Sequence, residues 1–120
     1  MQDSENLFKE IEQQIVSLAE STVSNYKEEA IRDAREMLAT MKIDLIRWTA
    51  LLADNQIKIN EFEWLINSDK ELVKMKTLEK AGLAASRTAA FGFSVMNLIM
   101  DTAIRKVVGN APEVAPVVTG

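Results

Sequence analysis

The sequence predicts an all-α protein built on a long antiparallel helical hairpin. None of the first 81 residues is Gly or Pro, although strands and tight turns normally use both. Ala, Leu, Ile, Met, Glu, Lys and Gln dominate the same stretch, and these residue types favour helix. Apolar side chains also recur at helical spacing, which predicts helices with one buried face.

The first predicted helix covers residues 4–53. Small and apolar residues along it step by four, three and four positions, an 11-residue repeat that keeps them on one face. This stripe is the first predicted interface, and it comprises Ala19, Val23, Tyr26, Ala30, Ala34, Met37, Met41, Leu45, Trp48 and Leu52.

Continuity of this helix is the open question of the fold. A straight helix of this length measures about 75 Å, whereas a compact domain of this size has a radius of gyration of about 14 Å. The weakest point is the segment 21–25, where Ser, Thr and Asn side chains compete for backbone hydrogen bonds. Because the stripe passes through Val23 and Tyr26 in register, we expect continuity or at most a kink. A break near Asn25 would instead let one chain fold as a compact bundle of three or four helices.

A short elbow helix over residues 57–67 follows the first helix. Asp54 and Asn55 end the first helix by composition, since both residue types favour caps and turns. Asn60 and Glu63 have the spacing of a capping box within the elbow.

The second long helix is predicted over residues 69–108. Ser68 and Glu71 have capping-box spacing at its start, and Gly109 marks its end. We therefore expect one helical domain over residues 1–109, followed by an extended, proline-containing tail over 110–120.

Small residues within 81–100 form the second predicted interface. They recur every four positions on neighbouring lines, which allows two helix backbones to approach closely. Two phenylalanines point in diverging directions beside them, so this helix can be contacted on two sides. The residues are Gly82, Ala85, Ser86, Ala89, Ala90, Phe91, Phe93 and Ser94.

Composition excludes many chemistries. The chain contains no His and no Cys, which removes the usual general base near pH 7 and the commonest transition-metal ligands. Four glycines supply neither a phosphate-binding loop nor a nucleophile elbow. We therefore expect no enzyme, no catalytic or metal-binding residues and no cofactor.

The net charge limits which partners are expected, and the first residues indicate the cell compartment. The net charge is −4, and no stretch is basic enough to neutralise several phosphates, so nucleic acid is not an expected partner. The first residues lack the basic and apolar regions of a secretory signal, which leads us to expect a cytoplasmic protein.

A two-helix hairpin leaves much of its apolar surface facing water, so we expect self-association to complete a helix bundle. The sequence therefore predicts a non-enzymatic, self-assembling structural or scaffold subunit that acts through helix–helix interfaces. One alternative is a membrane-active, holin-like or pore-forming protein that inserts residues 81–100. The uncharged stretch between Arg87 and Asp101 spans about 20 Å as helix, short of a hydrocarbon core of about 30 Å. The other alternative is an adaptor that binds a helical partner protein.

Overall fold

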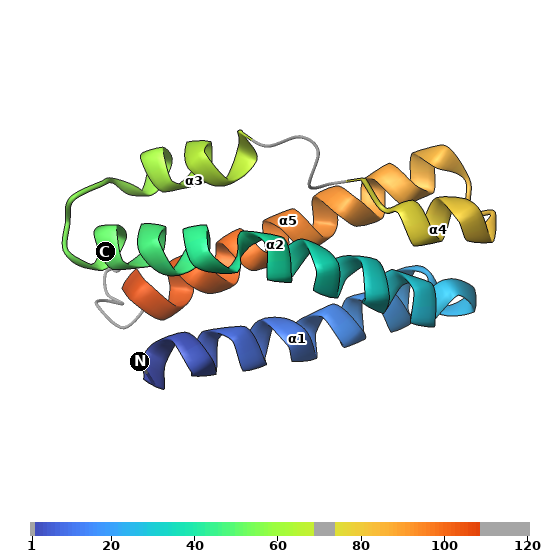
Figure 1. The fold of residues 1–120 in the computed structure, drawn as a ribbon, viewed down its shortest axis with the longest axis horizontal. Coiled ribbons are helices and arrows are strands. Elements are labelled where there is room, and N and C mark those ends of the chain that lie inside the picture. The colour runs from blue at the N-terminus through green and yellow to red at the C-terminus, as the bar shows by residue number, and fades with distance from the viewer. Residues whose placement is uncertain (1, 69–73, 109–120) are drawn as a thin grey trace, which may run out of the picture.

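The described part of the chain is built from helices, which confirms the all-α class. The computed structural model describes residues 2–68 and 74–108. The elements in chain order are α1 Gln2–Thr22, the 3₁₀ helix η1 Ser24–Tyr26, α2 Lys27–Ala53, α3 Ile59–Asn67, α4 Lys76–Ala81 and α5 Ala85–Val108 (Figure 1).

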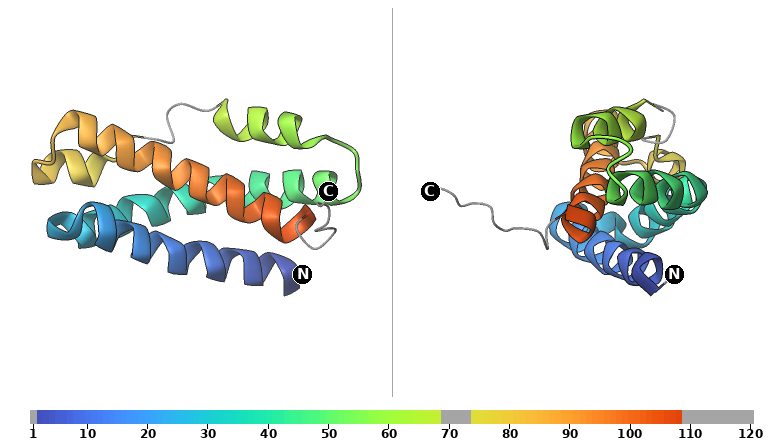
Figure 2. Two further views of the ribbon diagram at one scale, coloured as in Figure 1. Left: turned by 180° about the vertical axis from the view of Figure 1, so that it is seen from behind. Right: turned by 90° about the vertical axis from the view of Figure 1, so that its left-hand side faces the viewer.

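Within the described ranges, three long helices form the bundle, and two short ones cover it. Helices α1 and α2 run antiparallel, and α5 packs against both of them along the long axis (Figures 1 and 2). Helix α3 lies against α2 and α5, and α4 packs against the same two helices further along the bundle. The radius of gyration is 15.2 Å and the longest extent is 45 Å. A single helix over residues 4–53 does not fit that length.

The first predicted helix is broken rather than continuous. Helix α1 ends at Thr22, and Val23 leaves the helical region with φ −138° and ψ 50°. The hydroxyls of Ser21 and Thr22 donate to the carbonyl of Leu18 at 3.2 and 2.7 Å. These side chains thus compete for backbone hydrogen bonds, as the polar composition of the segment 21–25 suggested. The Arg87 guanidinium donates to the Thr22 carbonyl at 2.9 Å and so satisfies one terminal acceptor of α1. The expectation of continuity was therefore wrong, and the chain takes the compact alternative.

The stripe remains in register across the break and forms the core. Because the chain reverses at η1, the parts of the stripe on α1 and α2 face inward together. Eight of its ten residues are buried, and Tyr26 and Trp48 are partly buried against the same core. The inward face of α1 continues toward the amino terminus through Leu7, Ile11 and Ile15.

The elbow exists as α3, with a start different from the one predicted. The Glu61 carboxylate accepts a hydrogen bond from the Lys58 backbone N–H at 2.7 Å, so the capping side chain is Glu61 and not Glu63. Phe62 and Ile66 are buried beneath the helix. Their burial attaches α3 to the bundle.

The second long helix is also interrupted, and Gly82 is the reason. Helix α4 ends at Ala81, and Gly82 adopts φ +101°, a left-handed conformation that costs residues with a Cβ. Its N–H donates to the Glu79 carbonyl at 3.1 Å, and the Leu83 N–H donates to the Leu78 carbonyl at 3.2 Å. Gly82 is thus a helix-ending turn, and its predicted place in a helical seam was wrong. The capping pair's Ser68 ends α3 instead of starting a helix at residue 69, and the next described helix begins at Lys76. Glu71, Gly109 and the tail 110–120 lie outside the described residues.

A buried carboxylate on α2 caps α4. Asp33 is 4% exposed, and its Oδ1 and Oδ2 accept hydrogen bonds from the backbone N–H groups of Thr77 (3.1 Å) and Leu78 (2.8 Å). The residue at the cap position of α4 is Met75, whose side chain has no oxygen to accept these bonds. Asp33 therefore acts as an N-cap supplied from another helix, where the helix dipole also favours negative charge.

We predict that Asp33→Ala destabilises the protein by about 2–3 kcal/mol, because one buried and one partly buried N–H group lose their acceptor. Asp33→Asn retains one acceptor oxygen, so its loss should be smaller, about 1 kcal/mol. Urea unfolding followed by circular dichroism measures both values. Asp44→Ala, which removes a partly exposed ion pair with Arg47, is the control and should change stability by less than about 0.5 kcal/mol. Equal effects of Asp33→Ala and Asp44→Ala would contradict the capping role.

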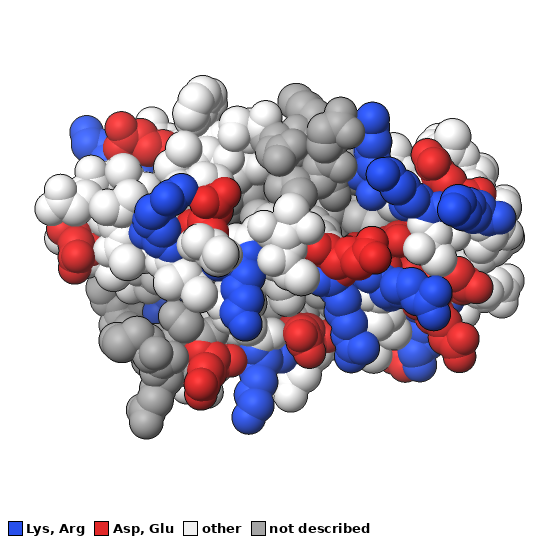
Figure 3. Space-filling model, viewed as in Figure 1, with Lys and Arg blue, Asp and Glu red and all other residues white. Residues whose placement is uncertain are grey.

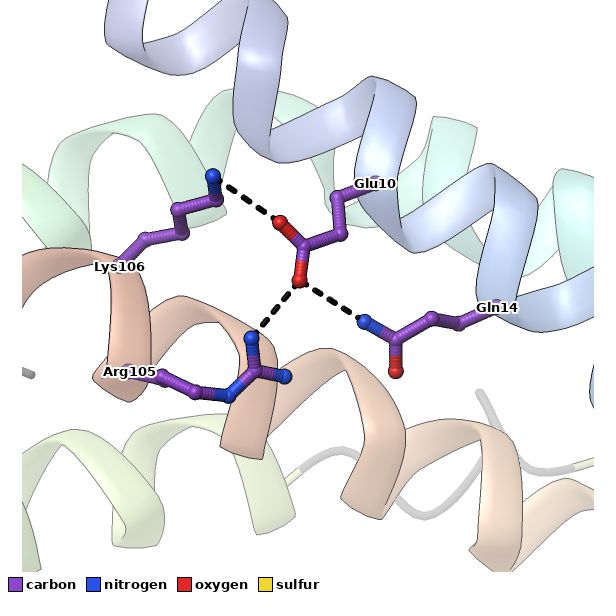
Figure 4. Close-up of polar contacts among 4 residues, drawn as sticks. All are labelled: Glu10, Gln14, Arg105 and Lys106. Carbon is purple, nitrogen blue, oxygen red and sulfur yellow. Dashed lines mark hydrogen bonds and ion pairs between the residues drawn. The ribbon is translucent and has the colours of Figure 1, made fainter.

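Glu10 ties α1 to the last turn of α5 (Figure 4). Its Oε2 accepts hydrogen bonds from Arg105 Nη1 at 2.7 Å and from Gln14 Nε2 at 3.0 Å, and its Oε1 lies 2.9 Å from Lys106 Nζ. The hydrogen bond from Arg105, followed by that from Lys106, lowers the pKa of Glu10 below its usual value. The two cations also lie at the carboxyl end of α5, where the helix dipole favours positive charge.

This lowered pKa predicts a defined pH dependence. A carboxyl group whose pKa is lower in the folded state stabilises the protein above its unfolded pKa, and this contribution disappears as the pH falls through the folded pKa. The difference in melting temperature between wild type and Glu10→Gln should therefore be present near neutral pH and shrink below about pH 4.5. Thermal melts across this range test it, with the exposed Glu12→Gln as control. A difference that stays constant down to the most acidic pH would contradict the contribution of the ion pairs.

Candidate helix–helix interface

The residues of the predicted stripe pack inside one chain in this structure. They meet α5 side chains such as Val95 and Ile99, both of which are 0% exposed, in a single hydrophobic core. The stripe therefore explains how the monomer holds together, and surfaces available to another molecule must be sought on the outer faces of the helices.

The second predicted interface lies largely on the surface. Ala85, Ser86, Ala89 and Ala90 are exposed on the first turns of α5, and Phe93 is 49% exposed beside them. The two phenylalanines diverge as the sequence suggested, since Phe91 is buried in the core. Ser94 is partly buried, and Gly82 lies outside α5 altogether. We call Ala85, Ser86, Ala89, Ala90 and Phe93 the α5 face.

A second exposed apolar line runs along the outer side of α2. It consists of Ala39, Ile43, Ile46 and Ala50, spaced by four, three and four residues, and we call it the α2 line. Ile43 is 78% exposed and Ile46 is 37% exposed. Helix α2 is therefore apolar on two faces over its second half, with the core on one side and the α2 line on the other.

The sequence analysis missed the α2 line, although its signal is present in the sequence. Following the best repeat along α2 selected the buried stripe, and the isoleucines between its members were left unassigned. Two apolar lines on one helix are the expected pattern for a helix that is contacted on two sides.

Charged residues frame the α2 line without interrupting it. Arg47 pairs with Asp44 at 2.8 Å on one flank, and Lys42 Nζ lies 5.4 Å from the centre of the Phe8 ring on the other. Toward the start of α2 the outer face becomes charged, and an open hollow there is lined by Glu28, Ile31, Arg32, Arg35, Glu36 and Ala39. In the space-filling view, charges crowd the end where α4 covers α2, whereas uncharged surface predominates toward the other end of α2 (Figure 3).

The helices that carry the α2 line and the α5 face lie on opposite sides of the bundle. Helix α2 lies in front of α5 in Figure 1, and α5 lies in front when the molecule is seen from behind (Figure 2, left). Seen along the long axis, the two helices occupy opposite sides (Figure 2, right). One molecule therefore presents apolar helix surface in two directions.

The described residues offer little support for other kinds of site. Within ranges 2–68 and 74–108, no group of three or more acidic side chains could hold a metal ion. Among the helices of these ranges, none is both long enough and apolar enough to cross a membrane. Trp64, 69% exposed on α3, is a further aromatic side chain on the surface.

Comparison with protein-family models, with curated proteins and with solved structures finds no match to this chain. Its function is therefore inferred from the chain's own surfaces.

Two alanine positions provide a test of this arrangement. Ala34→Leu inserts three carbons into a site that is 0% exposed, so overpacking should lower stability by about 1–3 kcal/mol. Ala89→Leu makes the same change on the exposed α5 face and should alter the stability of the monomer by less than about 0.5 kcal/mol. Chemical unfolding at low protein concentration measures both. A loss at Ala89 as large as that at Ala34 would mean that Ala89 is packed within the chain.

Proposed function

We propose that this protein is a non-enzymatic, self-assembling structural or scaffold subunit that acts through helix–helix contacts. The observation that carries the proposal is the α2 line, in which Ile43 is 78% exposed and a second isoleucine follows one turn later. Isolated apolar residues are normal on protein surfaces, but a continuous apolar line on a helix favours a partner. Burying an isoleucine side chain contributes about 1.5–3 kcal/mol, which gives such a contact its driving force.

The placement of the apolar surfaces supports a subunit rather than a terminal binding module. Because the α2 line and the α5 face are exposed on helices that lie on opposite sides of the bundle, one molecule can contact two neighbours at once. Small side chains on the α5 face permit close approach of another helix, and Phe93 supplies an aromatic anchor of the kind enriched in interfaces.

The membrane-active alternative receives less support from the same surfaces. Phe91, Val95 and Ile99 of the 81–100 segment are buried in the core, and Gly82 separates α4 from α5. Insertion of this segment would require the bundle to open and expose the apolar residues of α1 and α2 to water. An adaptor that uses the α2 line on a different protein remains an outcome of the experiment below.

Sedimentation velocity over a range of micromolar concentrations tests the proposal. We predict that the wild type forms dimers or larger species as concentration rises. Ile43→Glu should weaken this association at least about tenfold, since a charge would take the place of an isoleucine that the proposed contact buries. Ile59→Glu is a matched control, because Ile59 is 40% exposed on α3 and lies outside both surfaces. Thermal melts of both variants should match that of the wild type.

A wild type that remains monomeric throughout the range would contradict self-assembly. If that monomer bound another helical protein through the α2 line, the adaptor reading would replace it. Equal weakening by Ile43→Glu and Ile59→Glu would remove the α2 line from the proposal.

A further inference from the structure

We infer that two copies of this chain exchange α1: the turn at η1 straightens, α1 and α2 become one helix, and α1 of each copy packs on α2 and α5 of the other. This inference rests on the proposed self-assembly and adds a second kind of contact to it. It is carried by the buried face that runs through the turn, by the residues of the turn and by the contacts that hold α1 to α5.

The buried face of α1 continues into that of α2. Ala19, Val23 and Ala30 are each at most 3% exposed. They are spaced by four and seven residues, so a straight helix through the turn keeps them on one side. A turn that only reverses the chain does not need this spacing, because it can rotate α1 freely relative to α2. The spacing therefore allows one straight helix over residues 2–53 with a single buried face.

Exchange between two copies requires such a face. Consider a two-fold axis that passes through the turns at right angles to the plane of the two straight helices. The α1 half of each helix then lies beside the α2 half of the other. Both copies of α5 lie on the same side of this helix pair, so the two halves of each straight helix must bury the same side. The continuous stripe meets this requirement.

The turn itself is compatible with a helix. Residues 19–30 contain neither Gly nor Pro, and the side chains of Ser24 and Asn25 are exposed in the monomer. Neither Val23, which precedes η1, nor Tyr26, which precedes α2, provides a side-chain cap. A continuous helix supplies backbone acceptors to the N–H groups at the start of α2 and donors to the last carbonyls of α1. Straightening therefore satisfies backbone groups that the turn leaves without caps.

The packing of α1 can be reproduced by α1 of another copy. Ile11 and Ile15 are 0% exposed, so α1 can leave its own bundle only where an identical site receives it. The Glu10 carboxylate, which lies 2.7 Å from Arg105 Nη1 and 2.9 Å from Lys106 Nζ, meets the same cations in the other chain (Figure 4). The free energies of the two states therefore differ chiefly at the turn and in the entropy of association.

The exchange leaves the outer faces of the bundle unchanged. Each half of the dimer has the packing of the monomer, so the α2 line and the α5 face stay exposed for further contacts. Because α1 must leave the bundle, exchange is slow beside association through the α2 line. The dimer is also elongated, since a straight helix over residues 2–53 measures about 78 Å, against 45 Å for the longest extent of the monomer.

Zero-length cross-linking tests the exchange in the wild-type chain. Equal amounts of unlabelled and isotopically labelled protein are unfolded in urea and refolded together, and monomer and dimer are separated by size-exclusion chromatography. A carbodiimide then joins the Glu10 carboxylate to the adjacent Lys106 amine as an amide, and peptide mass spectrometry shows whether one chain or two supplied the link. In the dimer we expect about half of these links to join a labelled to an unlabelled chain, because random pairing makes half of the dimers mixed. In the monomer we expect almost none.

Ser24→Pro should prevent the exchange without unfolding the monomer. Ser24 is the first residue of η1, a position that tolerates proline, and Val23 before it is outside the α region. In a straight helix the same proline removes a backbone hydrogen bond and clashes with the preceding turn, so the amount of exchanged dimer should fall at least about tenfold. Ile59→Pro is the matched control, because Ile59 is the first residue of α3 and follows an extended Lys58. It should leave the mixed links unchanged.

Alanine substitution in the turn acts in the opposite direction. Ser24→Ala combined with Asn25→Ala raises the helix propensity of the turn, because alanine is the strongest helix former. We expect severalfold more exchanged dimer at the same protein concentration. A double variant that forms less exchanged dimer than the wild type would contradict the straightened helix.

The outcomes separate this inference from the proposed function. Ile43→Glu should leave the mixed Glu10–Lys106 links intact while it weakens association through the α2 line. A dimer in which every such link joins residues of one chain would overturn the exchange while the proposed self-assembly stands. Mixed links that persist undiminished in Ser24→Pro would also overturn it. A wild type that is monomeric at all concentrations would overturn both.

Discussion

The buried carboxylate of Asp33 is the polar contact on which the second half of the fold depends. Helix α4 has six residues, too few to be stable in isolation, and its own cap residue cannot accept a hydrogen bond. Asp33 supplies two acceptors from the second turn of α2 and thereby holds the start of α4 against the bundle. Met75, Leu78 and Leu83, in and beside α4, are buried in the core. The left-handed turn at Gly82 then leads the chain into α5. A carboxylate is tolerated at a 4% exposed site because both of its oxygens are bonded.

Once α5 has started, polar contacts hold it to α1 near both of its ends. Arg87 donates to the last residue of α1, and Arg105 pairs with Glu10 in the amino-terminal half of α1. Between these contacts the attraction is apolar, through α5 residues such as Val95 and Ile99. The reversal at η1 places α1 against α2, and these two arginines hold α1 against α5.

Some apolar residues of α2 and α5 lie outside this core, and they are exposed on the outer faces of these helices. The stripe contributes to the hydrophobic core of one chain, whereas the exposed isoleucines of α2 and the small residues of the α5 face lie outside that core. Their lines follow helical spacing, as expected when a helix is contacted from outside as well as from inside. The proposed assembly gives these residues a physical role.

Much of the secondary structure could be predicted from local sequence. The absence of early glycine, the helix-forming composition and the 4-3-4 spacing predicted that residues 4–53 are mainly helical and which side of them is buried, because these are properties of single helices. The break at Val23 was visible only as a polar segment in competition with a continuous stripe. The buried stripe could not decide between a continuous helix and a break at Val23. The same residues are buried whether the chain reverses into an antiparallel pair or continues as a straight helix packed on a partner.

Only the tertiary structure decided which apolar surfaces the chain uses itself. Whether Ala89 is packed or exposed depends on where α5 lies relative to α1 and α2, and no spacing along α5 contains that information. Gly82 likewise fits a helical line in sequence, but the position of α4 requires a left-handed turn there, and glycine adopts it at least cost. Sequence alone thus determined the helical class and the inward face of the first two long helices, and it shows that the chain has neither His nor Cys for chemistry. The long-range contacts of Asp33 and Arg87 determined how those helices fold back, and hence which faces remain open to a partner.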